Sequence, residues 1–92
     1  MTKLKEKVAV VTGASSGIGE AIAKKLSQQG TSIVLVGRNE QRLNEIAQQL
    51  NTPAKVVSAD ATVKSNIDDM LKAVIDHFGH IDIVVNSAGQ SL

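Results

Sequence analysis

The sequence predicts an α/β fold in which the strands of a parallel β-sheet alternate with helices. Two short runs, Val8–Val11 and Ile33–Val36, are apolar at every position, which is typical of strands buried on both faces of a sheet. The longer segments between such runs place apolar residues three and four positions apart, as one face of a helix requires. A turn with three glycines, T-G-A-S-S-G-I-G at residues 12–19, leads directly out of the first run.

Composition indicates a small globular unit. Hydrophobic residues make up 42% and charged residues 21% of the 92 residues, close to the average for folded domains. The formal net charge of +1 does not indicate the basic surface that binds nucleic acid. No apolar run has the length of a membrane span or of the apolar region of a signal peptide. The sequence has no cysteine, which excludes disulfides and thiolate sites. We therefore expect a cytoplasmic protein without nucleic-acid or membrane partners.

The first strand, Val8–Val11, precedes a predicted helix over Gly17–Gln29. Gly30 stands where this helix should end, because a residue without a Cβ adopts the left-handed conformation of a helix end at little cost. The residues expected on the buried face of the helix share a helical spacing: Ile18, Ala21, Ile22 and Leu26.

The second strand, Ile33–Val36, leads into a helix that we expect Asn39 to cap, since its side chain can accept from a free backbone N–H of the first turn. Pro53 separates this helix from a third strand, Lys55–Ala59. The apolar face of the helix follows the i, i+3, i+4, i+7 spacing: Leu43, Ile46, Ala47 and Leu50.

The third helix is expected to have Thr62 or Ser65 as its cap and to end at Gly79. A fourth apolar strand, Ile81–Val85, follows it. The apolar face of the helix comprises Ile67, Met70, Leu71, Val74 and Phe78.

The order β-α-β-α-β-α-β predicts part of a Rossmann-type, doubly wound parallel sheet. Connections between parallel strands are right-handed almost without exception. If the chain reverses direction after the third strand, the strands take the order 3-2-1-4 of a dinucleotide-binding half. Residues 1–92 are thus expected to form the N-terminal dinucleotide-binding part of one domain.

The glycine turn is predicted to hold phosphate. The first backbone N–H groups of a helix lack partners, and together with the helix dipole they favour an anion. Glycines let the backbone approach that anion closely, and the hydroxyls of Ser15 and Ser16 can add donors. The alternative is that the glycines only make a tight turn, but their position inside a strand–helix–strand unit favours the binding site.

The spacing T-G-x-x-x-G-x-G differs from the common G-x-G-x-x-G, and with it the sequence resembles the short-chain dehydrogenase/reductase family. Two further motifs occur in the order expected of that family. Asp60, after the third strand, matches the acidic position that contacts the adenine amino group. Residues 86–89, N-S-A-G, match the family's N-N-A-G motif with Ser in its second place. The resemblance covers essentially the whole chain.

This resemblance implies a nicotinamide dinucleotide as ligand and assigns its contacts. Asp60 has an alternative role as a helix cap, and Asn86 has one in holding backbone across the sheet. The pyrophosphate and adjoining ribose would be lined by Gly13, Ser15, Ser16, Gly17, Ile18 and Gly19. The adenine would be bordered by Asp60 and Ala61, and the ribose flanked by Asn86, Ala88 and Gly89.

The residue that ends the second strand distinguishes NADP from NAD. An acidic residue there binds the ribose hydroxyls of NAD, whereas a basic residue pairs with the 2′-phosphate of NADP. This chain has Arg38 and no acidic residue at that point, although Ser16 stands where many NADP-preferring members carry a basic residue. Against the alternative of a solvated surface arginine, we expect NADP to be favoured over NAD.

No catalytic residue can be assigned. The family's hydride transfer uses a tyrosine as acid/base, a lysine four residues later and a serine, and this sequence contains no tyrosine. Ser87 and Ser91 lie in or beside the N-S-A-G segment and are not candidates for that serine. His77 and His80 flank Gly79 without the spacing of a metal site, so no metal is expected.

Two hypotheses follow. The first is the cofactor-binding N-terminal portion of an oxidoreductase that acts on an alcohol or carbonyl compound, inactive as the 92-residue chain alone. The alternative is a non-enzymatic, stand-alone half-domain for nucleotide binding or self-association. An apolar fourth strand at the edge of the sheet predicts association through that edge or an uncovered apolar face.

Overall fold

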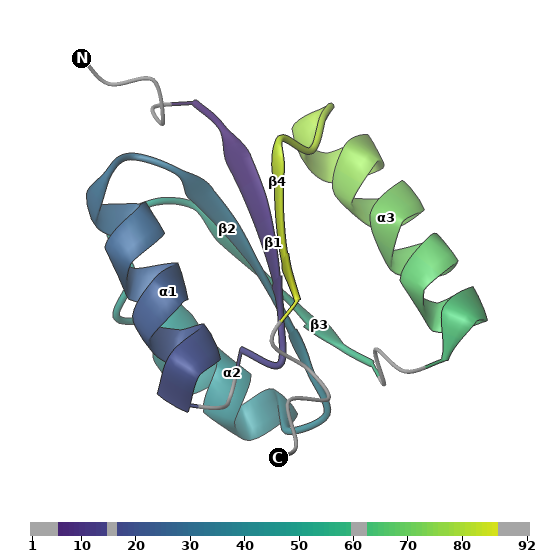
Figure 1. The fold of residues 1–92 in the computed structure, drawn as a ribbon, viewed down its shortest axis with the longest axis horizontal. Coiled ribbons are helices and arrows are strands. Elements are labelled where there is room, and N and C mark those ends of the chain that lie inside the picture. The colour runs from purple at the N-terminus through teal and green to yellow at the C-terminus, as the bar shows by residue number, and fades with distance from the viewer. Residues whose placement is uncertain (1–5, 15–16, 60–62, 87–92) are drawn as a thin grey trace.

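The computed structural model describes residues 6–14, 17–59 and 63–86, which form a four-stranded parallel sheet with helices on both faces (Figure 1). The sheet order β3-β2-β1-β4 confirms the predicted topology. The elements are β1 (Val8–Thr12), α1 (Gly17–Gln28), β2 (Ser32–Gly37), α2 (Glu40–Ala47), β3 (Ala54–Ser58), α3 (Lys64–Phe78) and β4 (Ile83–Asn86).

The core consists of two apolar layers, one on each face of the sheet. Alternate residues of β1 and β2 point to opposite faces, so Val11 and Leu35 pack with α1 and α2 while Val10 and Val34 pack with α3. All of these side chains are fully buried. Burying one such side chain stabilises the fold by about 1.5–3 kcal/mol. The uninterrupted apolar runs of the two central strands therefore reflect helices on both faces.

The buried face of α1 differs from the predicted one. Ile18 is 64% exposed and Ala21 is also exposed, so the expectation that they face the core is wrong. While Leu26 of the predicted face is partly buried and packs against the core, the fully buried residues are Gly19, Ala23 and Ser27, which repeat every four positions. Their small side chains let the helix approach the sheet closely.

Ser27 belongs to a polar contact that joins the end of α1 to the chain entering β3. Its hydroxyl oxygen accepts from the backbone N–H groups of Asn51 (2.9 Å) and Thr52 (3.2 Å). The Thr52 hydroxyl in turn donates to the carbonyl of Thr31. These hydrogen bonds compensate the burial of Ser27, which explains why a polar residue stands on the core side of α1.

Three helix ends agree with prediction. The side chain of Asn39 accepts from the Arg42 backbone N–H at 3.1 Å, as expected of a cap. Gly30 and Gly79 both have positive φ, 94° and 91°, and the Gly79 N–H donates to the carbonyl of Ile75 at 2.7 Å.

The start of α3 and the limits of the edge strands differ from prediction. The cap position is Val63, without a side-chain hydrogen bond, and Ser65 lies inside the helix, so the cap at Ser65 is wrong. Thr62 lies outside the described residues. β4 begins two residues later than expected, and the carboxylate of the preceding Asp82 accepts from the Val8 N–H at 2.9 Å. β3 begins and ends one residue earlier than the predicted Lys55–Ala59.

In the part of the chain that the structure describes, no helix has both the length and the apolar character needed to cross a bilayer.

Gly79→Ala is expected to lower the free energy of unfolding by about 1–2 kcal/mol, because alanine is strained in the left-handed conformation that ends α3. Urea denaturation of the 92-residue chain measures the change. Gly17→Ala is the matched control, since an added Cβ there meets no atom within 4 Å and the residue opens a helix. Equal losses in both variants would contradict this account of Gly79.

Candidate functional site

The candidate site lies where the carboxyl ends of the central strands meet. Parallel pairing places Thr12 of β1 level with Val36 of β2 and with Asn86 of β4. The chain leaves β1 toward β2 and later returns to β4 on the other side, so β1 and β4 border the point where the direction of winding changes (Figure 1). Open α/β sheets bind their ligands in the crevice at such a point.

The turn that leaves β1 is held against β2. Gly13 has φ 67°, a left-handed conformation that favours glycine. The next residue, Ala14, is fully buried and its backbone N–H donates to the carbonyl of Val36 at 3.1 Å. The first part of the glycine turn is therefore fixed relative to the end of β2.

The amino end of α1 presents backbone to open space. α1 begins at Gly17, where an added Cβ would meet no atom within 4 Å. Packing within the described residues therefore does not require glycine at this position, whereas a ligand lying against the helix end would. Gly19, two residues later, is buried and turns toward the sheet. A phosphate group fits a helix amino end at which a glycine leaves room for it.

Arg38 follows β2 directly and is exposed. Within residues 6–14, 17–59 and 63–86 its side chain makes no hydrogen bond or ion pair. The nearest acidic residue along the chain is Glu40, which opens α2. The guanidinium of Arg38 is consequently free to pair with an anion at this edge of the sheet.

The side chain of Asn86 makes a hydrogen bond within the protein. The hydroxyl of Thr12 is 3.0 Å from the Asn86 side-chain oxygen and 3.3 Å from the Val85 carbonyl, so it links the ends of β1 and β4. This contact agrees with the alternative that Asn86 holds neighbouring strands together.

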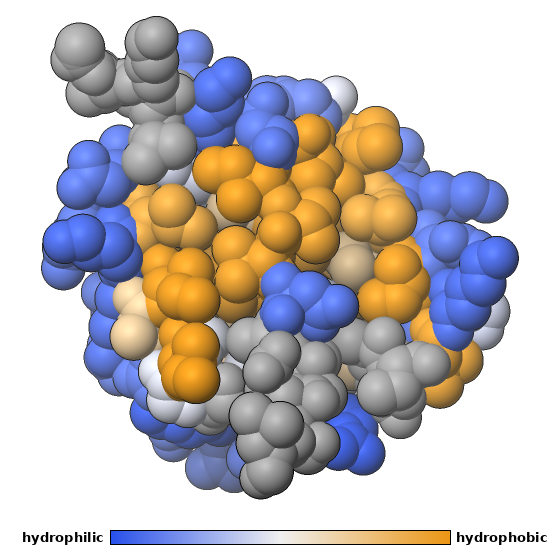
Figure 2. All heavy atoms as spheres, in the orientation of Figure 1, coloured by the Kyte–Doolittle hydropathy of each residue, from blue (hydrophilic) through white to orange (hydrophobic). Residues whose placement is uncertain are grey.

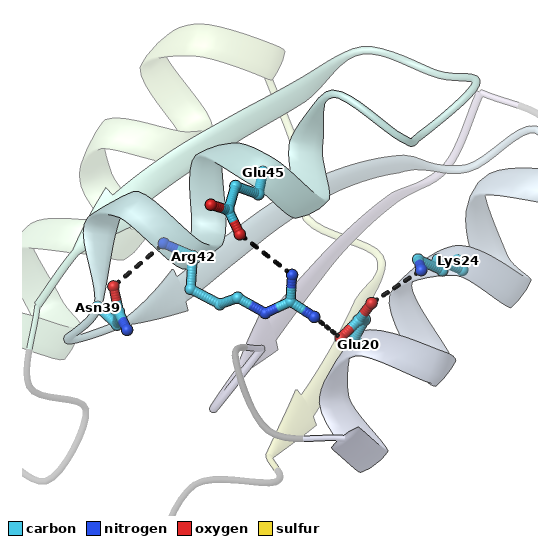
Figure 3. A network of polar contacts seen from close by, with 5 residues as sticks. All are labelled: Glu20, Lys24, Asn39, Arg42 and Glu45. Atoms are coloured by element: carbon cyan, nitrogen blue, oxygen red, sulfur yellow. Dashed lines mark hydrogen bonds and ion pairs between the residues drawn. The ribbon is translucent and has the colours of Figure 1, made fainter.

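A network of charges joins α1 to α2 beside the site (Figure 3). Glu20, in the first turn of α1, pairs with Lys24 at 2.8 Å and with the guanidinium of Arg42 from α2. Arg42 also reaches Glu45 at 3.3 Å, while its backbone N–H donates to Asn39. The predictions from the sequence did not include this network. The i, i+4 spacing of Glu20 and Lys24 signals one pair, but nothing in the sequence shows that Arg42 reaches α1.

The network changes the acidity of Glu20. The hydrogen bond from Lys24 is the largest effect on the pKa of the Glu20 carboxyl and lowers it below its ordinary value of 4.5. Burial, the next largest effect, opposes this, and the positive charges of Arg42 and Lys24 add to the lowering, so the pKa remains lowered overall. Glu20 therefore remains ionised to lower pH in the folded chain than in the unfolded chain.

Four of the predicted positions meet at this edge of the sheet: Gly13, Gly17, Arg38 and Asn86. Ile18 projects into solvent at the start of α1, and Gly19 faces the sheet. The remaining predicted positions lie outside the described residues: Ser15, Ser16, Asp60, Ala61, Ala88 and Gly89.

The histidines lie away from this edge. His80 Nε2 is 3.1 Å from the carboxylate of Asp82, next to the start of β1, and the ring of His77 contacts that of Phe78 edge to face. Among the described side chains, no group of three or more His, Cys, Asp or Glu residues could hold a metal ion.

Comparisons with known proteins agree with this geometry. The short chain dehydrogenase family matches residues 7–92. An uncharacterised oxidoreductase of Staphylococcus epidermidis is 96% identical over all 92 residues, which span 40% of its length. A metagenomic short-chain oxidoreductase solved in complex with NADP superposes with a TM-score of 0.87 at 35% identity, covering 92% of this chain and 40% of that one. For 3-ketoacyl-(acyl-carrier-protein) reductase from Brucella melitensis, complexed with NADH, the TM-score is 0.83 at 34% identity, with 89% and 34% coverage.

Glu20 is expected to make the stability of the chain depend on pH. Its pKa is lower in the folded state, so its contribution is present above pH 4.5 and is lost as the pH falls through the lowered value. Urea denaturation between neutral and acid pH should show a smaller loss of stability for Glu20→Gln than for the unaltered chain. Glu45→Gln, which removes the more exposed partner of Arg42, is the control. Identical pH profiles for the unaltered chain and Glu20→Gln would contradict the assignment.

Proposed function

The chain belongs to the short-chain dehydrogenase family, and we propose that residues 1–92 form the N-terminal, NADP(H)-binding part of an oxidoreductase acting on an alcohol or carbonyl compound in the cytoplasm. This proposal rests on one observation: two features suited to phosphate binding lie together at one edge of the sheet. The amino end of α1 has room for a phosphate at Gly17, and Arg38, which makes no ion pair within the described residues, lies at the end of the adjacent strand.

The glycine turn would hold the pyrophosphate. The turn at Gly13 and the open space at Gly17 support this role. Ser15, Ser16, Ile18 and Gly19 complete the proposed lining. Asp60 and Ala61 would border the adenine, and Asn86, Ala88 and Gly89 the adjoining ribose.

Arg38 supports NADP over NAD. A 2′-phosphate carries negative charge that a free guanidinium can bind with two hydrogen bonds, and no acidic residue ends β2 to bind the ribose hydroxyls of NAD. The family's structures include complexes with NADP and with NADH, so membership alone leaves both cofactors open. The charge at the end of β2 is therefore the basis of the preference.

When bound, the nicotinamide supplies or accepts the hydride of an alcohol–carbonyl interconversion. The 92 residues contain no tyrosine to move the accompanying proton, and they span 40% of the S. epidermidis relative. We assign them cofactor binding and no catalytic residue. The chain alone should show no NADPH-dependent carbonyl reduction.

Arg38→Ala is expected to weaken NADPH binding about tenfold or more while changing NADH binding less than about twofold, because only NADPH carries the 2′-phosphate. A complete protein for this measurement is a chimera in which these 92 residues replace the matching segment of the S. epidermidis oxidoreductase. Fluorescence titration with each cofactor yields the dissociation constants. Lys25→Ala, at the far end of α1, is the control for loss of one positive charge. Equal weakening of both cofactors by Arg38→Ala would contradict the NADP assignment.

A second candidate, a self-association module, is supported by β4. Within the described residues β4 pairs only with β1, and Val84 at its centre is 60% exposed. Figure 2 shows a continuous apolar surface between α1 and α3, over the region of β1 and β4 in Figure 1. Edge strands with exposed apolar side chains pair readily with other chains.

The 92-residue chain is expected to form dimers or larger species as its concentration rises, as measured by sedimentation equilibrium. Val84→Lys should shift the chain toward monomer, because a charged residue on an edge strand opposes pairing. Ile75→Lys is the matched control, since Ile75 is also exposed but lies on α3. A well-folded monomer at every concentration would exclude this second candidate.

A further inference from the structure

We propose that the ion pair between Glu20 and Arg42 positions Arg38 relative to the glycine turn and so contributes to the selection of NADPH over NADH. This inference rests on the proposed function and assigns a role to two residues outside the proposed binding site.

The ion pair connects the two elements that carry the site. Glu20 lies in the first turn of α1, at the end that would hold the pyrophosphate, and Arg42 lies in α2, which follows Arg38. The pair joins residues 22 positions apart, and Figure 3 shows the Arg42 side chain extending from α2 to Glu20. Both helices pack on the same face of the sheet.

Arg42 is also tied to the neighbour of Arg38. Its backbone N–H donates to the side chain of Asn39 at 3.1 Å, and the Leu43 N–H donates to the Asn39 carbonyl at 3.0 Å. Asn39 follows Arg38 directly. The start of α1 is thereby linked through Glu20, Arg42 and Asn39 to the backbone that carries Arg38.

The two arginines have separate roles. Arg42 pairs with two carboxylates, Glu20 and Glu45, whereas Arg38 pairs with none in the portion of the chain that the structure describes. The Glu20 side chain is 18% exposed and that of Arg42 is 37% exposed, so the contact between the helices is partly buried. Arg42 would have to break both pairs to bind a phosphate, which leaves that task to Arg38.

Positioning and simple electrostatic attraction predict opposite effects of removing the Glu20 charge. Glu20→Gln makes the site less negative, so attraction alone would tighten the binding of NADPH. If the ion pair positions Arg38, the same substitution loosens the link between α1 and α2 and weakens NADPH binding. The sign of the change therefore separates the two mechanisms.

The test uses the chimera described above, titrated with NADPH and with NADH. Glu20→Gln is expected to weaken NADPH binding about two- to fivefold, the range of a partly exposed ion pair, and to change NADH binding less than about twofold. In an Arg38→Ala background, Glu20→Gln should cause no further loss, because the residue being positioned is absent. A merely structural role for Glu20 would weaken both cofactors in both backgrounds.

Three further variants complete the test. Lys24→Met removes the other cation beside Glu20 but keeps the contact with α2, so the ratio of NADPH to NADH affinity should stay within about twofold. Arg42→Met should reproduce the effect of Glu20→Gln, and Arg42→Lys, which retains the charge, should recover part of it. Thermal unfolding of each variant verifies that it is folded.

Tighter or unchanged NADPH binding in Glu20→Gln would overturn the inference, as would a loss that persists without Arg38. If Arg38→Ala alone weakens both cofactors equally, the NADP assignment itself fails. The two failures are therefore distinguishable in one set of titrations.

Discussion

The burial of β1 between two layers of helices is the constraint on which the rest of the structure depends. Its five residues are all buried, and it pairs in parallel with β2 on one side and β4 on the other. Parallel neighbours require crossover connections, which place α1 and α2 on one face and α3 on the other. The same arrangement brings the carboxyl ends of these three strands to one edge, where the candidate site lies.

Hydrogen bonds at this edge hold the loops where a ligand would need them. The N–H of Ala14 bonds to β2, and the hydroxyl of Thr12 bonds to the end of β4. Farther from the sheet, the ion pair of Glu20 with Arg42 spans the helices that follow β1 and β2. A dinucleotide has phosphates at separate points along its length, so the spacing between these loops matters as much as the residues within them.

Several helix ends could be predicted from the sequence because one residue type decides the local conformation, although the cap predicted at Ser65 was wrong. Gly30 and Gly79 adopt the positive φ of helix ends, and Asn39 caps α2, because these preferences depend on neighbouring backbone alone. Arg38 was also recognisable, since its place after an apolar strand puts it at the carboxyl edge of any parallel sheet. The candidate site could therefore be proposed from the sequence.

The sequence by itself determined the alternation of elements and the location of the glycine turn, because apolar periodicity leaves few alternatives. It predicted the strand order on the condition that the chain reverses direction after the third strand, which the structure confirms. Only the tertiary structure decided which side of α1 is buried. Close packing on the sheet selects the small residues Gly19, Ala23 and Ser27 over the larger Ile18. The tertiary structure also decided which carboxylate on α1 pairs with Arg42. Contacts between side chains 22 residues apart depend on how two helices lie on the sheet, and no local sequence pattern predicts this arrangement.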